Sequence, residues 1–277
     1  MEVREATSPE TLAGASTEEL RRRYLLRSLF EPGRLRLVYS HEDRLIVGGA
    51  VPAGQRLRLE PEGPVRARHF LENREAGILH VGGGPGVVIV DGQRHELAPR
   101  DILYVGRGAE EVELESASGT DPSRLYVVSA VAHRAFPTVQ IREDDIVPVE
   151  LGSPGGASLR ALRRYVPPAE GQSAALMMGV TTIHPGSVWN TMPTHTHDRR
   201  TEVYLYFGLP ENDRVVHLMG APEETRTLVV ANEEAVISPP WSIHAGVGTA
   251  SYRFCWAVAG ENTDYDDMDP VPPSRLR

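Results

Sequence analysis

The sequence predicts a mainly β protein that forms two barrels or jelly rolls, with one short helix near its N-terminus. Short β-rich runs recur along the chain between Gly, Pro, Asp and Asn residues, a pattern typical of a sandwich or barrel. A loop-like stretch at residues 147–158 contains Pro148, Pro154 and two adjacent glycines, and it divides the chain into halves. Residues 92–105 and 232–240 share a weak rhythm of strand, turn and strand, which indicates that the halves repeat one unit.

The helix is expected to begin at Thr17 and to continue to Phe30. Thr17-Glu18-Glu19-Leu20 has the form of a capping box, in which a hydroxyl and a carboxyl side chain satisfy the free backbone N–H groups of the first turn. Leu20, Tyr24 and Leu25 would then share one apolar stripe. A Pro-Gly pair follows and ends the segment.

The runs expected to form strands are rich in Val, Ile, Leu and Tyr and are bounded by turn-forming residues. In the first half they are residues 35–39, 45–47, 87–90, 102–105 and 125–128. In the second half they are residues 174–182, 201–207, 215–219, 227–230, 235–237 and 251–259. The Asp91-Gly92 pair predicts a two-residue hairpin turn between Val90 and Gln93.

The composition excludes several classes of function. The formal net charge of −9 argues against nucleic acid as a partner, because phosphate binding needs a basic surface. All 29 basic residues are arginine, so Schiff-base chemistry on a lysine is excluded. No apolar run approaches the ~20 residues that a membrane span needs, and no signal peptide is evident, so we expect a cytoplasmic protein without membrane contact. The only cysteine, Cys255, reads as a buried strand residue.

The most specific motif runs from His195 to Glu202, with His244 downstream. His195 and His197 are two residues apart and face the same side of a strand, within reach of one ion. Glu202 has the opposite parity, so Asp198-Arg199-Arg200 must turn the chain to bring it round. The first half lacks such a set. We therefore expect an N-terminal barrel without metal ligands over residues 1–150 and a metal-binding barrel over residues 151–277.

The ligand types alone do not select one metal. Imidazole and carboxylate together suit Zn, Fe, Mn, Ni or Co. The histidines must be neutral to bind, and Asp198 or Thr196 is a candidate to fix their tautomers by hydrogen bonding.

Other residues near the motif are candidates for substrate binding or proton transfer. Arg199 and Arg200 could hold a substrate carboxylate, although a solvated turn is the alternative interpretation. Tyr206 is either a core phenol or a pocket hydroxyl. The candidates for a general base are Glu202, Tyr206, His184 and the acidic segment 264–269.

The sequence resembles the 5-keto-4-deoxyuronate isomerase family over nearly its whole length. The motifs that carry the resemblance are residues 195–204, 220–226 and 237–248 in the second half, with 38–44, 46–49, 70–75 and 103–106 in the first. Two departures are small, because neither removes a ligand: Asp198 stands where the family often has Glu, and Pro240 where it often has Ser.

The resemblance implies a bicupin fold, a zinc ion on His195, His197, Glu202 and His244, and a homohexamer. It also implies an aldose–ketose isomerase that converts 5-dehydro-4-deoxy-D-glucuronate, a small keto-uronate, to 3-deoxy-D-glycero-2,5-hexodiulosonate in pectin and uronate catabolism. Two alternatives remain open on the ligand set, because a fold does not fix a function. One is a cupin dioxygenase that uses iron, and the other is a non-enzymatic sugar-binding cupin.

Overall fold

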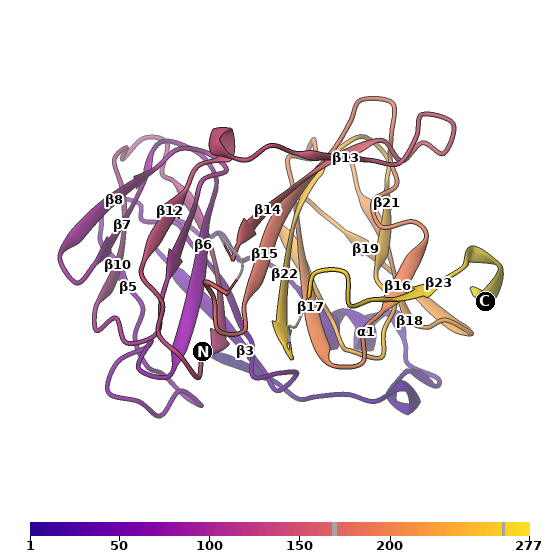
Figure 1. The fold of residues 1–277 in the computed structure, drawn as a ribbon, viewed down its shortest axis with the longest axis horizontal. Coiled ribbons are helices and arrows are strands. Elements are labelled where there is room, and N and C mark those ends of the chain that lie inside the picture. The colour runs from indigo at the N-terminus through magenta and orange to yellow at the C-terminus, as the bar shows by residue number, and fades with distance from the viewer. Residues whose placement is uncertain (168–170, 262–263) are drawn as a thin grey trace. The chain divides into compact units, whose positions relative to one another are not determined.

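The structure is a computed structural model that describes residues 1–167, 171–261 and 264–277 (Figure 1). It is mainly β and groups into two compact units. Unit 1 comprises residues 1–4, 28–147 and 164–178, and unit 2 comprises residues 5–27, 148–163 and 179–277. The expected boundary at residue 150 lies close to the change of unit after residue 147. Each half of the chain also gives a segment to the other unit: residues 5–27 group with unit 2, and residues 164–178 group with unit 1. The local composition does not predict this exchange of segments.

Unit 1 is built on two antiparallel sheets, apart from one parallel edge strand (Figure 1). The larger sheet has the order β1 (Glu2–Arg4), β3 (Leu35–Ser40), β4 (Ile46–Ala50), β11 (Arg124–Val131), β6 (Arg74–Gly82), β9 (Ile102–Val105) and β12 (Val139–Ile141). The smaller sheet has the order β5 (Leu57–Arg58), β10 (Val112–Ser116), β7 (Gly86–Val90) and β8 (Gln93–Leu97).

A second set of sheets supplies unit 2 (Figure 1). Its large sheet has the order β13 (Val149–Leu151), β14 (Arg160–Val166), β15 (Met177–Ile183), β22 (Arg253–Gly260), β17 (Arg200–Phe207), β20 (Glu234–Ser238) and β2 (Leu25–Leu26). A three-stranded sheet has the order β19 (Glu224–Val230), β18 (Val215–Ala221) and β21 (Ala245–Gly248), and β16 (Thr194–Thr196) pairs with β23 (Asp269–Val271).

The two sets of sheets repeat one topology. Without their edge strands, the large sheets have the orders β3-β4-β11-β6-β9 and β14-β15-β22-β17-β20. The small sheets have the orders β8-β7-β10 and β19-β18-β21. In both sets the strands follow one another along the chain in the same sequence, so the weak rhythm at residues 92–105 and 232–240 reflects a repeat of the whole strand arrangement.

The single α-helix of the described residues, α1 (Thr17–Tyr24), differs from its prediction at both ends. Its N-cap is Ser16, whose hydroxyl accepts a hydrogen bond from the Glu19 backbone N–H at 3.2 Å, so the expected start of the capping box at Thr17 is wrong by one residue. The expected continuation to Phe30 is also wrong, because residues 25 and 26 form β2 and pair with β20. Three short 3₁₀ helices complete the described chain: η1 (Pro9–Leu12), η2 (Glu143–Asp145) and η3 (Pro273–Arg275). None of these helices has the length and hydropathy to span a bilayer.

The expected strands form, most of them longer than predicted. The Asp91-Gly92 hairpin is confirmed: both residues have positive φ, 49° and 83°, as a type I′ turn requires, and Val90 pairs with Gln93. Strand β6 was not predicted because Arg74, Glu75 and two glycines interrupt its apolar residues.

The apolar core of unit 1 lies beside a fully buried carboxylate. The core includes Ala76 and Ile78 of β6. Glu75, fully buried on the other face of that strand, accepts hydrogen bonds from the backbone N–H groups of residues 174, 175 and 176 at 2.7–2.8 Å and from the Tyr104 hydroxyl at 2.5 Å. This carboxylate therefore fastens the start of β15 to the sheet.

Candidate metal and substrate site

Four potential metal ligands meet in unit 2. His195 lies in β16, the chain turns at residues 198 and 199, and β17 begins at Arg200, so Glu202 returns beside the histidines as the strand parity requires. His244 directly precedes β21. One nitrogen or oxygen of each residue lies within 4.8 Å of those of the other three. The fold thus brings together His195 and His244, which are 49 residues apart in the sequence.

The distances within this cluster leave room for a shared ion. The Nε2 atoms of His244 and His195 lie 2.9 Å apart. Glu202 Oε2 lies 3.0 Å from His197 Nε2 and 2.9 Å from His244 Nε2. His244, His197 and Glu202 are buried. Such an assembly of nitrogen and carboxylate donors is typical of a divalent metal site.

Backbone carbonyl oxygens orient two of the imidazoles. His197 Nδ1 lies 2.9 Å from the Arg200 carbonyl oxygen, and His244 Nδ1 lies 3.3 Å from the Ser242 carbonyl oxygen. A carbonyl can only accept, so each Nδ1 carries the proton and each Nε2 lone pair is directed at the cluster. Sequence reasoning placed this role on Asp198 or Thr196, whereas for these two histidines the main chain supplies it.

The electrostatics of the cluster lower the pKa values of His195 and Glu202. Burial lowers the pKa of His195 well below its ordinary value, and the neighbouring His244 lowers it further. Burial alone would raise the pKa of Glu202, but His244 and His197 outweigh it and the net shift is downward. A neutral imidazole and an ionised carboxylate are the forms that bind a metal.

Tyr206, a predicted catalytic residue, points into the same interior as Glu202 but is already engaged. Its hydroxyl lies 2.7 Å from His217 Nδ1 and 3.4 Å from Asn190 Nδ2. Burial raises its pKa well above the ordinary value, and Tyr252 adds to the shift. A phenol that stays neutral and is hydrogen-bonded on both sides is suited to holding its neighbours in place.

The two predicted arginines have different surroundings. The Arg199 side chain is 50% exposed and forms an ion pair with Asp267. Arg200 is almost fully buried and donates hydrogen bonds to the backbone carbonyl oxygens of Asp264, at 2.8 Å, and of Asp267. Arg200 therefore fastens the segment that precedes β23 to the start of β17.

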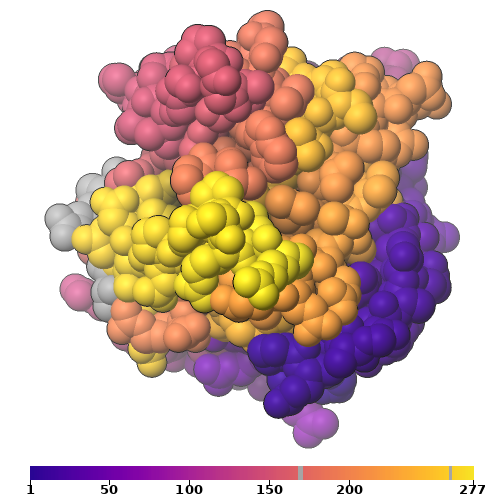
Figure 2. All heavy atoms as spheres, turned by 90° about the vertical axis from the view of Figure 1, so that its right-hand side faces the viewer, coloured from indigo at the N-terminus to yellow at the C-terminus, as the bar shows by residue number. Residues whose placement is uncertain are grey.

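That C-terminal segment covers part of the site. β23 pairs with β16, and Pro270 lies opposite His195. In the space-filling view the yellow C-terminal residues lie on the surface across orange residues of unit 2 (Figure 2).

Sequence reasoning missed Arg160, which lies at the start of β14. This arginine is partly buried and donates one hydrogen bond, to the Ser158 carbonyl oxygen at 2.9 Å. Among the described residues it forms no ion pair with a carboxylate. Burial lowers its pKa, while the nearby hydroxyls of Tyr204, Tyr265 and Tyr252 raise it. No sequence motif marks it, because its neighbours come from distant parts of the chain.

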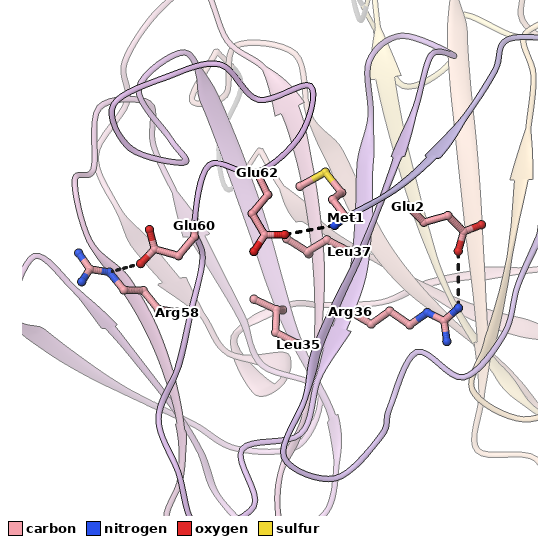
Figure 3. A pocket seen from close by; sticks show the side chains of 8 residues that line it. All are labelled: Met1, Glu2, Leu35, Arg36, Leu37, Arg58, Glu60 and Glu62. Carbon is pink, nitrogen blue, oxygen red and sulfur yellow. Dashed lines mark hydrogen bonds and ion pairs between the residues drawn. The ribbon is translucent and has the colours of Figure 1, made fainter.

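Two further features lie outside the cluster. His184, a candidate base, is one-third exposed, and its Nε2 lies within hydrogen-bond distance, 2.8 Å, of Glu150 Oε2. A pocket of about 220 Å³ in unit 1 is lined by alternating charges (Figure 3). These charges neutralise one another in pairs: the Met1 amino group with Glu62 at 3.1 Å, Arg58 with Glu60 at 3.0 Å, and Arg36 with Glu2 at 3.5 Å.

Comparison with known proteins agrees with the geometry. A protein of Kineococcus radiotolerans named 4-deoxy-L-threo-5-hexosulose-uronate ketol-isomerase is 54% identical over 280 residues, with 100% of both chains covered. Proteins of the same name from Lachnoclostridium phytofermentans and Bacillus pumilus are 48% and 49% identical, again with full coverage of both chains.

Solved structures show the same fold at low sequence identity. An IolB-like protein from Salmonella typhimurium superposes with a TM-score of 0.71 at 16% identity, covering 90% of this chain and 96% of that one. An oxalate decarboxylase variant from Bacillus subtilis has a TM-score of 0.54 at 11% identity, covering 79% and 69%. The fold is therefore mainly β and cupin-like. The model of the KduI/IolB family matches residues 24–270, and the chain belongs to that family.

Proposed function

We propose that this protein is a metal-dependent 4-deoxy-L-threo-5-hexosulose-uronate ketol-isomerase that acts on a small keto-uronate in uronate catabolism. The observation that carries the proposal is the convergence of His195, His197, Glu202 and His244 within 4.8 Å, in a chain 54% identical to a protein of that name. The two repeated sets of sheets are interpreted as a bicupin in which the second barrel holds the metal.

The donor set fits zinc, which takes imidazole nitrogens and carboxylate oxygens. Two of the Nε2 lone pairs are directed at the cluster by protons held on Nδ1, and the Nε2 atoms of His244 and His195 lie 2.9 Å apart. When bound there, the ion would polarise a carbonyl oxygen and an adjacent hydroxyl oxygen of the substrate and make the C–H between them more acidic.

The isomerisation moves a carbonyl from C1 to C2, so one proton must leave C2 and one must arrive at C1 through an enediol. Glu202 is the predicted base that lies in the cluster. Its Oε2 faces His197 and His244, while its Oε1 has no hydrogen-bond partner among the described residues. We assign the proton transfer to Oε1. Tyr206 and His184 are engaged elsewhere.

The substrate carboxylate requires a fixed cation, which in this lysine-free chain must be an arginine. We propose Arg160 for this role beside the predicted pair Arg199 and Arg200, because Arg160 has no carboxylate partner among the described residues. The test compares three alanine variants. We expect Arg160→Ala to raise KM by at least ~10-fold. A larger increase in KM for Arg199→Ala than for Arg160→Ala would show that Arg199, and not Arg160, binds the substrate carboxylate.

The test of the function is turnover of the keto-uronate, followed by NMR with and without a chelator. We expect the wild-type protein to form 3-deoxy-D-glycero-2,5-hexodiulosonate, to lose activity with the chelator and to regain it with zinc. The same turnover without oxygen separates isomerisation from an iron-dependent oxygenase. Full metal content and full activity in both His244→Ala and Glu202→Gln would contradict the site.

The proposal extends to assembly and location. We expect a homohexamer, for which light scattering after size-exclusion chromatography should give six times the chain mass of 30.4 kDa. We also expect the protein in the cytoplasm, which cell fractionation would test.

A further inference from the structure

A chain of three buried side chains runs through the interior of unit 2 beside the metal cluster. The chain consists of Asn190, Tyr206 and His217, all fully buried. Asn190 Nδ2 lies 3.4 Å from the Tyr206 hydroxyl, and that hydroxyl lies 2.7 Å from His217 Nδ1. None of the three is one of the four candidate ligands.

The direction of each hydrogen bond in this chain can be derived. Asn190 Oδ1 accepts from the backbone N–H groups of Gly246, at 2.5 Å, and of Thr191, so the amide NH₂ faces Tyr206. The Tyr206 oxygen therefore accepts from Asn190, and its own proton can go only to His217 Nδ1. A neutral imidazole has one proton, so His217 carries it on Nε2.

That Nε2–H group is a buried donor without a partner among the described residues. Four other buried polar atoms of unit 2 also lack partners among the described residues: Tyr24 OH, Thr181 Oγ1, Ser238 Oγ and Trp256 Nε1. Ser238 and Trp256 pair with Glu202 and Tyr204 in the sheet, so they share the inward face of these residues. Unsatisfied buried donors are costly, and their concentration here indicates an interior that a polar ligand completes.

His217 is placed to reach a ligand held at the cluster. It lies opposite Gly246 in the sheet, two residues along the chain from His244. The Tyr204 ring stands edge-on to both histidines, with centroid distances of 5.5 Å to His244 and 5.9 Å to His217.

We propose that His217 Nε2–H donates a hydrogen bond to an oxygen of the bound polyhydroxy keto acid, and that Asn190 and Tyr206 hold His217 in the required tautomer. The inference rests on the proposed function. His217 would stabilise the negative charge that develops on a substrate oxygen as the enediol forms. It acts as a donor and not as a base, because burial lowers its pKa to about 3 and its only basic nitrogen is occupied by Tyr206.

The kinetic test uses two substitutions at His217 and one matched control. We expect His217→Phe, which removes both ring nitrogens, to lower kcat/KM about 10- to 1,000-fold while metal content stays at the wild-type value. His217→Gln keeps an N–H donor near the position of Nε2 and should recover part of the loss. His133→Gln, a change at an exposed histidine of unit 1, should leave kcat/KM and metal content unchanged. Wild-type kcat/KM in both His217 variants would overturn the inference.

A second measurement uses the wild-type protein and does not depend on variant folding. NMR of the protein with ¹⁵N-labelled histidine should show His217 protonated on Nε2 at neutral pH. The substrate reduced with borohydride serves as a non-reacting analogue, and its binding should shift that N–H resonance downfield. A proton on Nδ1, or an unshifted resonance with the saturating analogue bound, would overturn the inference. Absence of isomerisation by metal-loaded wild-type protein would instead contradict the proposed function. Failure of the proposed function and failure of the His217 inference are therefore distinguishable.

Discussion

The two units share one strand order, yet the inward face of one strand differs between them. Strands β6 and β17 occupy the same place in their sheets. Arg74 pairs with the last residue of β11 as Arg200 pairs with the last residue of β22. Two residues on, Ala76 pairs with the end of β9 as Glu202 pairs with the end of β20. The carboxylate of one cluster thus corresponds to a methyl group in an apolar core.

This correspondence separates framework residues from site residues. Arg74 and Arg200 are both buried, and both donate to backbone carbonyl oxygens: Arg74 to Arg44 and Ser129, Arg200 to Asp264 and Asp267. An arginine that both units have at the same strand position, with the same kind of partner, belongs to the framework. Arg200 is therefore a weaker candidate for the carboxylate clamp than its position beside the ligands indicated.

Replacing Glu202 of unit 2 by alanine, the residue at the corresponding position of unit 1, should have the largest effect on activity. In Glu202→Ala the cluster loses its only carboxylate, and we expect activity to fall by ~1,000-fold or more together with bound metal. Metal analysis and turnover should be measured on the same preparation. An Arg74→Lys variant in unit 1 serves as the control for a change in β6. Undiminished metal content in Glu202→Ala would show that Glu202 is not a metal ligand.

The reverse change should not create a site. Ala76→Glu places a carboxylate in the apolar core of unit 1 without histidine partners. Burying an unpaired charge should lower the free energy of unfolding by about 3–5 kcal/mol. Urea denaturation checks this, with Ala76→Val as a control for added volume. Equal stability of the glutamate variant and the wild-type protein would mean that this interior is hydrated.

Glu75 sharpens the comparison, because Thr201 occupies its position in unit 2. In Glu75→Gln three backbone N–H groups must share one amide oxygen, and we expect a loss of about 2–3 kcal/mol. Tyr104→Phe, which removes a single hydrogen bond to the same carboxylate, should cost about 1 kcal/mol. Urea denaturation of both variants measures the difference. A larger loss in the tyrosine variant would contradict the fastening role of Glu75.

Acid should destabilise unit 2 through its buried His217. His217 has a folded pKa of about 3, below the unfolded value, so its contribution to stability is complete above about pH 6.5 and is lost as the pH falls toward 3. The slope approaches about 1.4 kcal/mol per pH unit. Between pH 7 and pH 5 the metal-free wild-type protein should therefore lose about 2 kcal/mol more than His217→Phe. Parallel pH profiles for the two proteins would contradict this.

A single methyl group at Gly246 should give the smallest effect. A Cβ there would lie 2.8 Å from the Tyr206 hydroxyl and 2.9 Å from Asn190 Nδ2. We expect Gly246→Ala to cost about 1–2 kcal/mol and to lower kcat/KM several-fold with metal retained. Gly155→Ala tests the general cost of losing a glycine, since that position has free space around it and no positive φ. Equal kcat/KM in the two variants would argue against a role for the positions of Asn190 and Tyr206 in catalysis.

Local signals in the sequence were sufficient for much of this structure. Alternating β-branched runs predicted the strands, and Asp-Gly predicted a type I′ hairpin. The parity argument for Glu202 was correct because it depends only on the two-residue period of a strand and the turn at residues 198 and 199.

Other features depend on residues that are distant in the chain. α1 ends at Tyr24 because β20, more than 200 residues later, pairs with the next two residues. His217 and Arg160 gain their surroundings from several strands, and a lone histidine or arginine carries no local mark of that. The tautomers of His197 and His244 depend on backbone carbonyl oxygens. Because every residue has such an oxygen, no pattern of side chains in the sequence predicts these tautomers.

The exchange of residues 5–27 also has a consequence for synthesis on the ribosome. Arg21 donates a hydrogen bond to the Val229 carbonyl oxygen at 2.8 Å, and Leu25 pairs with Val236. At 5–20 residues per second, the partners of this early segment emerge about 10–40 s after it. During that interval Leu20, Tyr24 and Leu25 have no native partner strand, so the nascent chain presents a short apolar segment that a chaperone could bind until the last strands arrive.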